Sequence, residues 1–125
     1  SILINSYNVE TILAEKIETV LRRGKYNSRM KDYYDIYFFL TKLRNEININ
    51  ILKDAIDNTF TKRDSFEYLN DYSEIIKSII DSDRIKTNWK SYSKKNSYAK
   101  NLEVDHIMIL LNNFIKELNL ELVTV

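Results

Sequence analysis

The residues most able to do chemistry are charged side chains at positions where helical spacing predicts apolar ones. Residues 9–24 read VETILAEKIETVLRRG, and their apolar members recur at the spacing of one buried helix face. At about 100° per residue, Lys16 falls near the middle of that face, between Leu13 and Val20. A lysine placed there needs an anionic partner or a ligand.

A second helical run, residues 28–43, carries carboxylates in the same way. Asp32 lies inside its apolar stripe, Asp35 lies beside it, and Arg29 opens the same face. An unpaired buried charge costs several kcal/mol. Lys16 and one of the two aspartates should therefore meet each other or a ligand.

Spacing alone leaves two interpretations open. In the first, Lys16 pairs with Asp32 or Asp35 and ties two antiparallel helices together, or its long stem carries the ammonium group to the rim. In the second, these charges bind a substrate. Residues 22–31, between the helices, hold five basic residues, which suits phosphate and a solvated loop about equally.

The order of these residues resembles a known family. Two patterns carry the resemblance, E-x-x-x-A-x-K and R-x-K-D-x-x-D, formed in order by Glu10, Ala14, Lys16, Arg29, Lys31, Asp32 and Asp35. They look like the last two motifs of the AbiEii/AbiGii toxin family, and AIDNTFTKR at residues 55–63 is similar to a segment that follows them. The match covers the first half of the chain well and the rest in its helical pattern.

The resemblance implies a nucleotidyltransferase-like toxin of bacterial abortive-infection and toxin–antitoxin systems, with a role in phage defence. Such an enzyme transfers an NMP from an NTP to RNA or protein and uses Mg²⁺ held by aspartates of a preceding α/β domain with a Gly-Ser motif. We expect residues 1–125 to be a single helical domain from the C-terminal portion of such a protein, without the α/β domain. It would complete the NTP site from the other side and be inactive alone.

Catalytic roles are implied for three residues. Lys16 would meet the triphosphate, because a compact cation can follow developing negative charge. Asp32 would orient Lys16 or help activate the acceptor hydroxyl, and Asp35 could do the same from one turn further on. No metal ligand is assigned within this chain.

Substrate-binding roles are implied for Glu10, Arg29 and Lys31. Arg29 and Lys31 would bind phosphate or nucleic acid, while Glu10 would hold Lys16 or a basic neighbour in place. The partners implied are a nucleotide, tRNA or another RNA, and a cognate antitoxin.

Composition describes an ordinary protein of one domain. The 125 residues are 44% hydrophobic and 30% charged, with a net charge of +1. The absence of cysteine excludes disulfides and thiolate metal sites, which suits a reducing cytoplasm. The longest apolar run, residues 107–111, is too short to span a membrane, and no signal peptide is present. We therefore expect a cytoplasmic protein without a membrane partner.

One glycine and no proline favour long helices, so we predict an all-α compact bundle of five to six helices. The expected helices are 9–24, 28–43, 50–60, 66–80, a basic stretch at 84–100 and 102–118. Asn8 and Ser28 are expected N-caps, and Gly24 suits a helix end. Glu15, Glu18 and Arg22 are expected on the wet side of the first helix. Residues 1–5 predict a short strand or a frayed end.

The stretch 84–100 supports a competing hypothesis, a non-catalytic helical module that binds RNA or a partner protein. It holds six basic residues and no acidic one, interleaved with Trp89, Tyr92 and Tyr98, as single-stranded or folded RNA requires. The commoner explanation is an amphipathic helix with Trp89 in the core. The sole histidine, His106, is expected on an exposed face and cannot form a metal site alone.

Overall fold

The computed structural model describes residues 8–121, and within that range the chain is helical and contains no β-strand. The helices are α2 (Val9–Arg23), α3 (Lys31–Thr41), α4 (Ile49–Lys62), α5 (Phe66–Asn70), α6 (Tyr72–Ile80), α7 (Asp83–Lys95) and α8 (Val104–Leu118). Short 3-10 helices η1 (Gly24–Tyr26), η2 (Arg44–Glu46) and η3 (Ser97–Ala99) lie in the connections. The predicted all-α class is confirmed.

The described range holds seven α-helices, one more than the upper end of the prediction, because the helix expected at 66–80 is broken. Asp71 has φ −95° and ψ 16°, so α5 ends before it and α6 starts after it. Asn70 and Asp71 both have low helix propensity, which favours a break at this point. The strand predicted at residues 1–5 lies outside the described residues.

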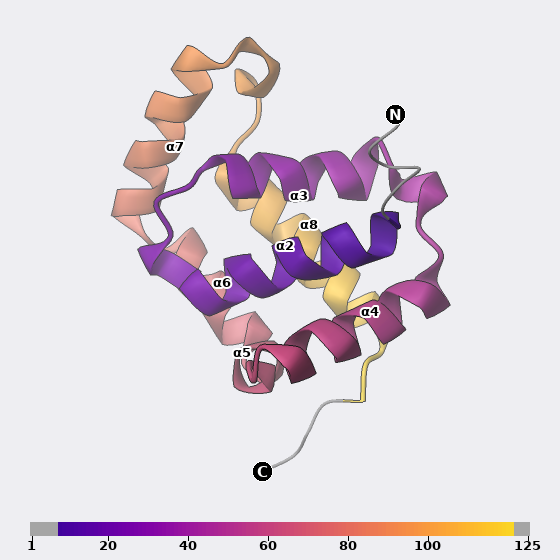
Figure 1. Ribbon diagram of the computed structural model, residues 1–125. Coiled ribbons are helices and arrows are strands. Elements are labelled where there is room, and N and C mark those ends of the chain that lie inside the picture. Colours follow the sequence, from indigo (N-terminus) through magenta and orange to yellow (C-terminus); the bar gives the residue numbers. More distant parts are fainter. Residues whose placement is uncertain (1–7, 122–125) are drawn as a thin grey trace.

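Helices α2 and α3 run antiparallel at the centre of the bundle (Figure 1). Helix α4 packs along α2, and α8 crosses behind to pack on α3 and α6. Helix α7 stands at one side and leads through η3 back to the bundle. The largest fully buried side chains come from almost every helix and include Leu13, Tyr33, Phe60, Ile79 and Ile107. A single shared core therefore holds α2 and α3 in place.

Local signals at the ends of α2 act as the sequence predicts. The Asn8 side chain accepts a hydrogen bond of 2.8 Å from the Thr11 backbone N–H, which caps the helix start. Gly24 follows the helix with φ 54°, a left-handed conformation that glycine adopts without cost. The predicted Ser28 cap is wrong. Helix α3 begins at Lys31, because the Asn27 side chain accepts from the Arg29 N–H at 3.1 Å and keeps this segment in a turn.

The Glu10 side chain fastens the start of α4 to α2. Glu10 is buried, and its Oε2 accepts a hydrogen bond of 2.7 Å from the backbone N–H of Asn48, the residue that caps α4. Ala14 on α2 and Ala55 on α4 are both buried, and small residues let two helices approach closely. The α2–α4 packing therefore depends on a polar contact at one end and small side chains along its length.

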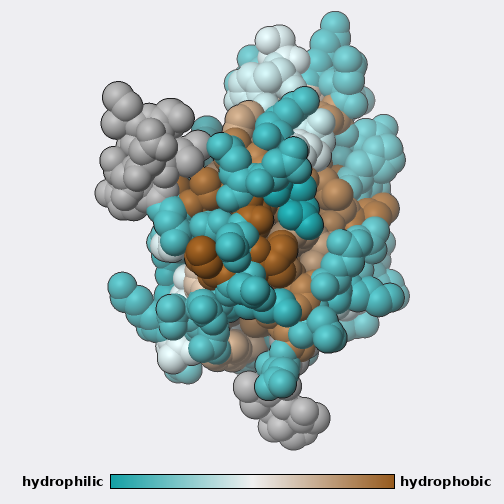
Figure 2. Space-filling view, turned by 90° about the vertical axis from the view of Figure 1, so that its right-hand side faces the viewer, coloured by the Kyte–Doolittle hydropathy of each residue, from teal (hydrophilic) through white to brown (hydrophobic). Residues whose placement is uncertain are grey.

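Figure 2 shows a face where hydrophobic residues reach the surface among hydrophilic ones. Large exposed hydrophobic residues in the described range are Tyr26, Ile51, Tyr98 and Ile109. Scattered exposure of this kind is normal for a folded domain. None of the described helices combines the length and apolar character needed to cross a membrane.

Replacing Glu10 by alanine removes the acceptor for Asn48 and an acidic group from the first turn of α2. We expect Glu10→Ala to lower the free energy of unfolding by about 1–2 kcal/mol, measured by urea denaturation. Glu117→Ala, at an exposed position of α8, is the control and should change it by less than about 0.5 kcal/mol. Equal effects of the two substitutions would show that the Glu10 contact does not stabilise the fold.

Candidate active site

A hollow of about 320 Å³ lies along one side of α2, facing the start of α3 and the end of α4. Five of its residues lie on α2, and the other three come from three further segments: Ile12, Glu15, Lys16, Thr19, Arg23, Arg29, Asp32 and Arg63. We call this hollow the cationic cleft, because its four basic residues outnumber its two acidic ones. Its size is within the range of small-molecule sites, about 300–1,000 Å³.

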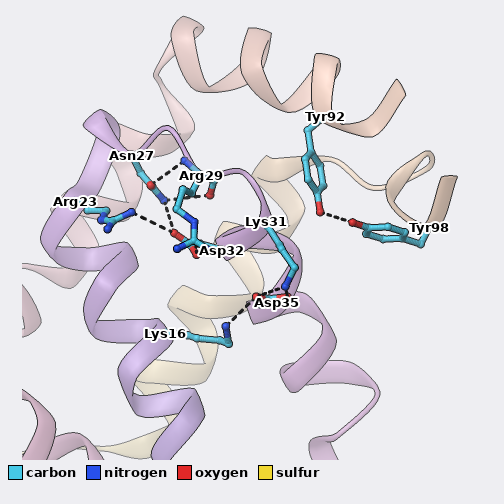
Figure 3. A network of polar contacts seen from close by, with 9 residues as sticks. All are labelled: Lys16, Arg23, Asn27, Arg29, Lys31, Asp32, Asp35, Tyr92 and Tyr98. Carbon is cyan, nitrogen blue, oxygen red and sulfur yellow. Dashed lines mark hydrogen bonds and ion pairs between the residues drawn. The ribbon is translucent and has the colours of Figure 1, made fainter. Parts of the chain in front are cut away.

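Lys16 reaches from α2 to Asp35 on α3 (Figure 3), with Nζ 2.8 Å from Oδ2. Lys31, one turn before Asp35, also bonds both of its carboxylate oxygens at 3.1 Å. The side chains of Lys16 and Asp35 are 28% and 13% exposed, so the pair lies at the rim of the core. Of the two partners that spacing left open for Lys16, the structure selects Asp35.

Asp32, three residues before Asp35 on α3, has a separate set of polar contacts. Its side chain is 8% exposed, and its Oδ2 accepts a hydrogen bond of 3.3 Å from the Asn27 side chain. Arg23 and Arg29 lie on either side, each 3.9 Å from the carboxylate (Figure 3). At that distance they neutralise Asp32 electrostatically without a direct hydrogen bond.

The cationic cleft therefore offers unused hydrogen-bond donors. Among residues 8–121, the guanidinium groups of Arg23 and Arg29 donate no hydrogen bond, and Lys16 uses one of its three N–H groups. Arginine and lysine donors directed at open space are suited to phosphate oxygens. The arrangement can bind a polyanion without breaking a buried ion pair.

Glu18 is the most deeply buried charge beside the cationic cleft, and its predicted place on the wet side of α2 is wrong. Its side chain is 0% exposed, because α4 covers this side of α2. Arg63, at the end of α4, donates to Oε1 at 2.6 Å, and Arg22 donates to Oε2 at 2.9 Å. Burial raises the pKa of Glu18, but the hydrogen bonds from Arg63 and Arg22 outweigh it and leave the pKa below its ordinary value.

Two tyrosines near the two aspartates, Tyr33 and Tyr92, have raised pKa values and stay protonated at neutral pH. Burial raises the pKa of Tyr33 to about 12, and the negative charge of Asp32 acts in the same direction. The Tyr92 and Tyr98 hydroxyls are 2.7 Å apart (Figure 3), and burial raises the pKa of Tyr92, with the Tyr98 hydrogen bond acting in the same direction. The Tyr33 and Tyr92 hydroxyls can therefore donate hydrogen bonds but cannot act as bases at neutral pH.

The six residues expected to form the site are not all brought together. Lys16, Asp32 and Arg29 line the cationic cleft, and Asp35 with its partner Lys31 lies at its edge. The expectation that Glu10 holds Lys16 or a basic neighbour is wrong, because Glu10 is directed to Asn48. Spacing within the two motifs could not reveal this contact, which depends on the path of the chain between α3 and α4.

Sequence reasoning did not assign Arg63 to the site. It lies 45 residues after Glu18 along the chain, so no helical periodicity connects the two. The signal that could have found it is AIDNTFTKR, since Arg63 is the last residue of that phrase. Its position follows from the end of α4, where Asp64 turns the chain with a left-handed φ of 52°.

The basic segment on α7 has Trp89 in the core, as the amphipathic interpretation predicts. Trp89 is 5% exposed, and its indole N–H donates to the Leu102 carbonyl at 2.8 Å. The lysines of α7 are exposed, and Tyr98 is 51% exposed. His106 is also exposed, at 78% of its side chain, which confirms the prediction for it.

The described residues do not fit a magnesium site. Asp32 and Asp35 each face two cationic side chains, and no cluster of three His, Cys, Asp or Glu residues occurs in the described range. Asp81 and Asp83 have the Asp-x-Asp spacing, but both are exposed at the junction of α6 and α7.

Breaking the Lys16–Asp35 pair should cost little stability, because Asp35 keeps Lys31 and neither partner is fully buried. We expect Lys16→Met to lower the free energy of unfolding by about 1 kcal/mol or less, measured by urea denaturation. A fully buried pair would lose about 3–5 kcal/mol instead. A loss of that size would make Lys16 a structural residue.

Glu18 should determine how the fold responds to acid. Because folding lowers its pKa below 4.5, ionised Glu18 stabilises the fold above about pH 4.5, and this contribution is lost as the pH falls through the folded-state pKa. We expect Glu18→Gln to lower the free energy of unfolding at pH 7 by about 2–3 kcal/mol and to flatten its decline between about pH 5 and pH 2.

The control for Glu18 is Glu15→Gln, one turn away on α2, where the side chain is 48% exposed. We expect this variant to keep the wild-type acid profile and to change stability by less than about 0.5 kcal/mol. Chemical denaturation across the pH range measures both. A Glu18→Gln profile as steep as that of the wild type would show that Glu18 is not the responsible group.

Comparison with known proteins adds one finding to this geometry. No match was found among curated proteins or among solved structures. The family model for the nucleotidyl transferase AbiEii toxin of type IV toxin–antitoxin systems matches residues 1–109, which is most of the chain. The resemblance seen in the two motifs is thereby confirmed, and the chain belongs to the AbiEii nucleotidyl transferase toxin family.

Proposed function

We propose that the cationic cleft is the helical side of an NTP site, and that the chain takes part in transferring an NMP to an acceptor hydroxyl of RNA or protein. The observation that carries the proposal is the set of unused donors on Lys16, Arg23 and Arg29 around one hollow. Nucleotidyl transfer relies on positioning and charge stabilisation, which such donors supply.

The proposal assigns distinct tasks to the residues of the cleft. Lys16 binds the triphosphate and follows the charge that develops on the leaving pyrophosphate. Asp35 orients Lys16 through the 2.8 Å contact, and Lys31 helps to hold Asp35 in place. Arg29, with a side chain 62% exposed, binds phosphate at the mouth of the cleft.

Asp32 has the remaining task, next to the arginines. Its contacts with Arg23 and Arg29 position both guanidinium groups for the phosphates, and its carboxylate would also accept a hydrogen bond from the acceptor hydroxyl. The metal-dependent part of the chemistry lies outside the described residues in this proposal. It belongs to an α/β domain that the resemblance implies in a longer protein, in which this chain is the C-terminal helical portion.

The partners proposed for the chain follow from the same assignment. Membership in a type IV toxin–antitoxin family implies a cognate antitoxin. The transfer reaction itself requires a nucleotide and an acceptor. The acceptor is tRNA, another RNA or a protein. A role in phage defence by abortive infection, in the cytoplasm, completes the proposal.

A second candidate function is a non-catalytic module that binds RNA through α7 and η3. The observation that favours it is the exposed Tyr98 beside the lysines of α7, a combination that allows base stacking next to phosphate contacts. In this case the cationic cleft would not be needed for function. Lys16→Ala would then leave RNA binding intact, whereas loss of the α7 lysines would abolish it.

The test uses a longer protein that contains this chain together with the α/β domain. It is incubated with labelled NTPs, Mg²⁺ and total cellular RNA, and the label transferred to RNA or protein is measured. We expect transfer by the parent and a fall of about 100-fold or more in Lys16→Ala, because one transition-state donor is lost. The 125-residue chain alone is expected to be inactive.

Lys116→Ala, at an exposed position of α8, is the matched control and should transfer label at the parent rate. Because Lys16→Met is expected to fold stably, loss of activity in a Lys16 variant cannot be attributed to unfolding. Undiminished transfer by Lys16→Ala would exclude the assignment of Lys16. No transfer by the parent, with RNA still bound, would favour the binding module.

A further inference from the structure

Arg63 lies in the wall shared by two neighbouring hollows. One is the cationic cleft; the other, of about 370 Å³, lies between α2 and α4. Arg63 and Glu15 line both hollows, whereas Lys16 lines the first and Lys62 the second. The Glu15–Arg63 ion pair, with Oε2 3.1 Å from Nη2, therefore lies between them.

The two carboxylates bound to Arg63 differ in burial. Glu18 is 0% exposed and accepts from Nη1 at 2.6 Å, so it fixes the position of the guanidinium group. Glu15 is 48% exposed and accepts from Nη2 at 3.1 Å. Exposed ion pairs contribute little because water and salt compete with them, whereas a buried carboxylate cannot give up its partner without a large cost.

We infer that Arg63 is a further phosphate-binding residue of the cleft, and that Glu15 occupies its free edge until a substrate phosphate displaces it. Glu18 holds one side of the guanidinium group and leaves the other free to bind two phosphate oxygens, as arginine does well. This inference rests on the proposed NTP site and extends it from α2 and α3 to α4.

Displacing Glu15 would also join the two hollows. A ligand whose phosphates lie beside Lys16 and Arg63 would then reach the space between α2 and α4. That space is lined by Ala55 and by the polar side chains of Asn58 and Thr11. A triphosphate carries more phosphate groups and more negative charge than a monophosphate, so it suits a cleft that is lined by both Arg63 and Lys16.

The experiment measures binding of inorganic tripolyphosphate to the 125-residue chain by isothermal titration calorimetry. We expect Glu15→Gln to tighten binding about three- to tenfold, because a negative charge beside Arg63 is removed. Removing Arg63 should weaken binding at least about tenfold. Arg63→Gln alone would leave the buried Glu18 carboxylate without one of its two arginines. Arg63 is therefore replaced together with Glu18, as Glu18→Gln/Arg63→Gln, and this double variant is compared with Glu18→Gln alone.

The decisive comparison repeats Glu15→Gln in the background without Arg63. In this background we expect Glu15→Gln to increase the tripolyphosphate affinity by less than about twofold, because Glu15 then has no guanidinium group to cover. Glu117→Gln, the same charge change at an exposed site on α8, should leave affinity unchanged. The inference would be overturned if Glu15→Gln increased the affinity equally with and without Arg63. It would also be overturned if Glu18→Gln/Arg63→Gln bound tripolyphosphate as tightly as Glu18→Gln.

This outcome is separate from that of the transfer assay. Tripolyphosphate binding requires neither the α/β domain nor an acceptor, so it reports on Arg63 even if no NMP transfer occurs. Conversely, transfer that depends on Lys16, combined with undiminished tripolyphosphate binding in the double variant, would support the proposed function and reject the role of Arg63.

Discussion

The buried carboxylate of Glu18 is the constraint on which the rest of the site depends. A carboxylate with no exposure must have cationic partners, and Arg22 alone, one turn away on the same helix, would leave one of its oxygens unpaired. Arg63 supplies the second partner from the end of α4. The electrostatic requirement of one residue on α2 therefore determines where a cation from α4 is held, and this cation forms a wall of the cationic cleft.

The charged contacts in and beside the cleft differ in the free energy that is needed to disrupt them. Glu18 is fully buried and is bonded by Arg63 at 2.6 Å and by Arg22 at 2.9 Å, so these contacts are expensive to disrupt although both arginines are partly exposed. The contacts of Lys16, Arg23 and Arg29 are partly exposed or as long as 3.9 Å, so they can be exchanged for ligand contacts at low cost. A polyanion can therefore enter the cleft while the packing of α2 against α3 and α4 is unchanged.

The sequence was sufficient to predict most of the fold because the helices follow local rules. The apolar stripe of α8 and the caps of α2 at Asn8 and Gly24 are local signals, and each appears where it was expected. The break at Asp71 and the late start of α3 were missed because periodicity alone does not detect where a helix is locally disfavoured. Asn70 and Asp71 have low helix propensity, and the Asn27 side chain holds the Arg29 N–H in a turn before α3.

The candidate site was predictable only where its residues belong to one pair of helices. Lys16, Asp32 and Asp35 lie on α2 and α3, which a short connection forces to be antiparallel neighbours. The helical wheel placed Lys16 toward α3 but could not choose between aspartates less than one turn apart. The contacts of Arg63 and Glu10 could not be predicted from the sequence, because they depend on how α4 packs on α2.

The same geometry ties the charged residues of α2 to the segment at 55–63. Helix α4 ends with Arg63 in the cleft, and its Ala55 is buried on the side that packs toward α2. If α4 moved away from α2, Arg63 would leave Glu18 and the buried carboxylate would lose its second arginine. The position of α4 is thus tied to the charge balance of the cleft, and the phrase AIDNTFTKR has a structural role even though most of its residues do not line the cleft.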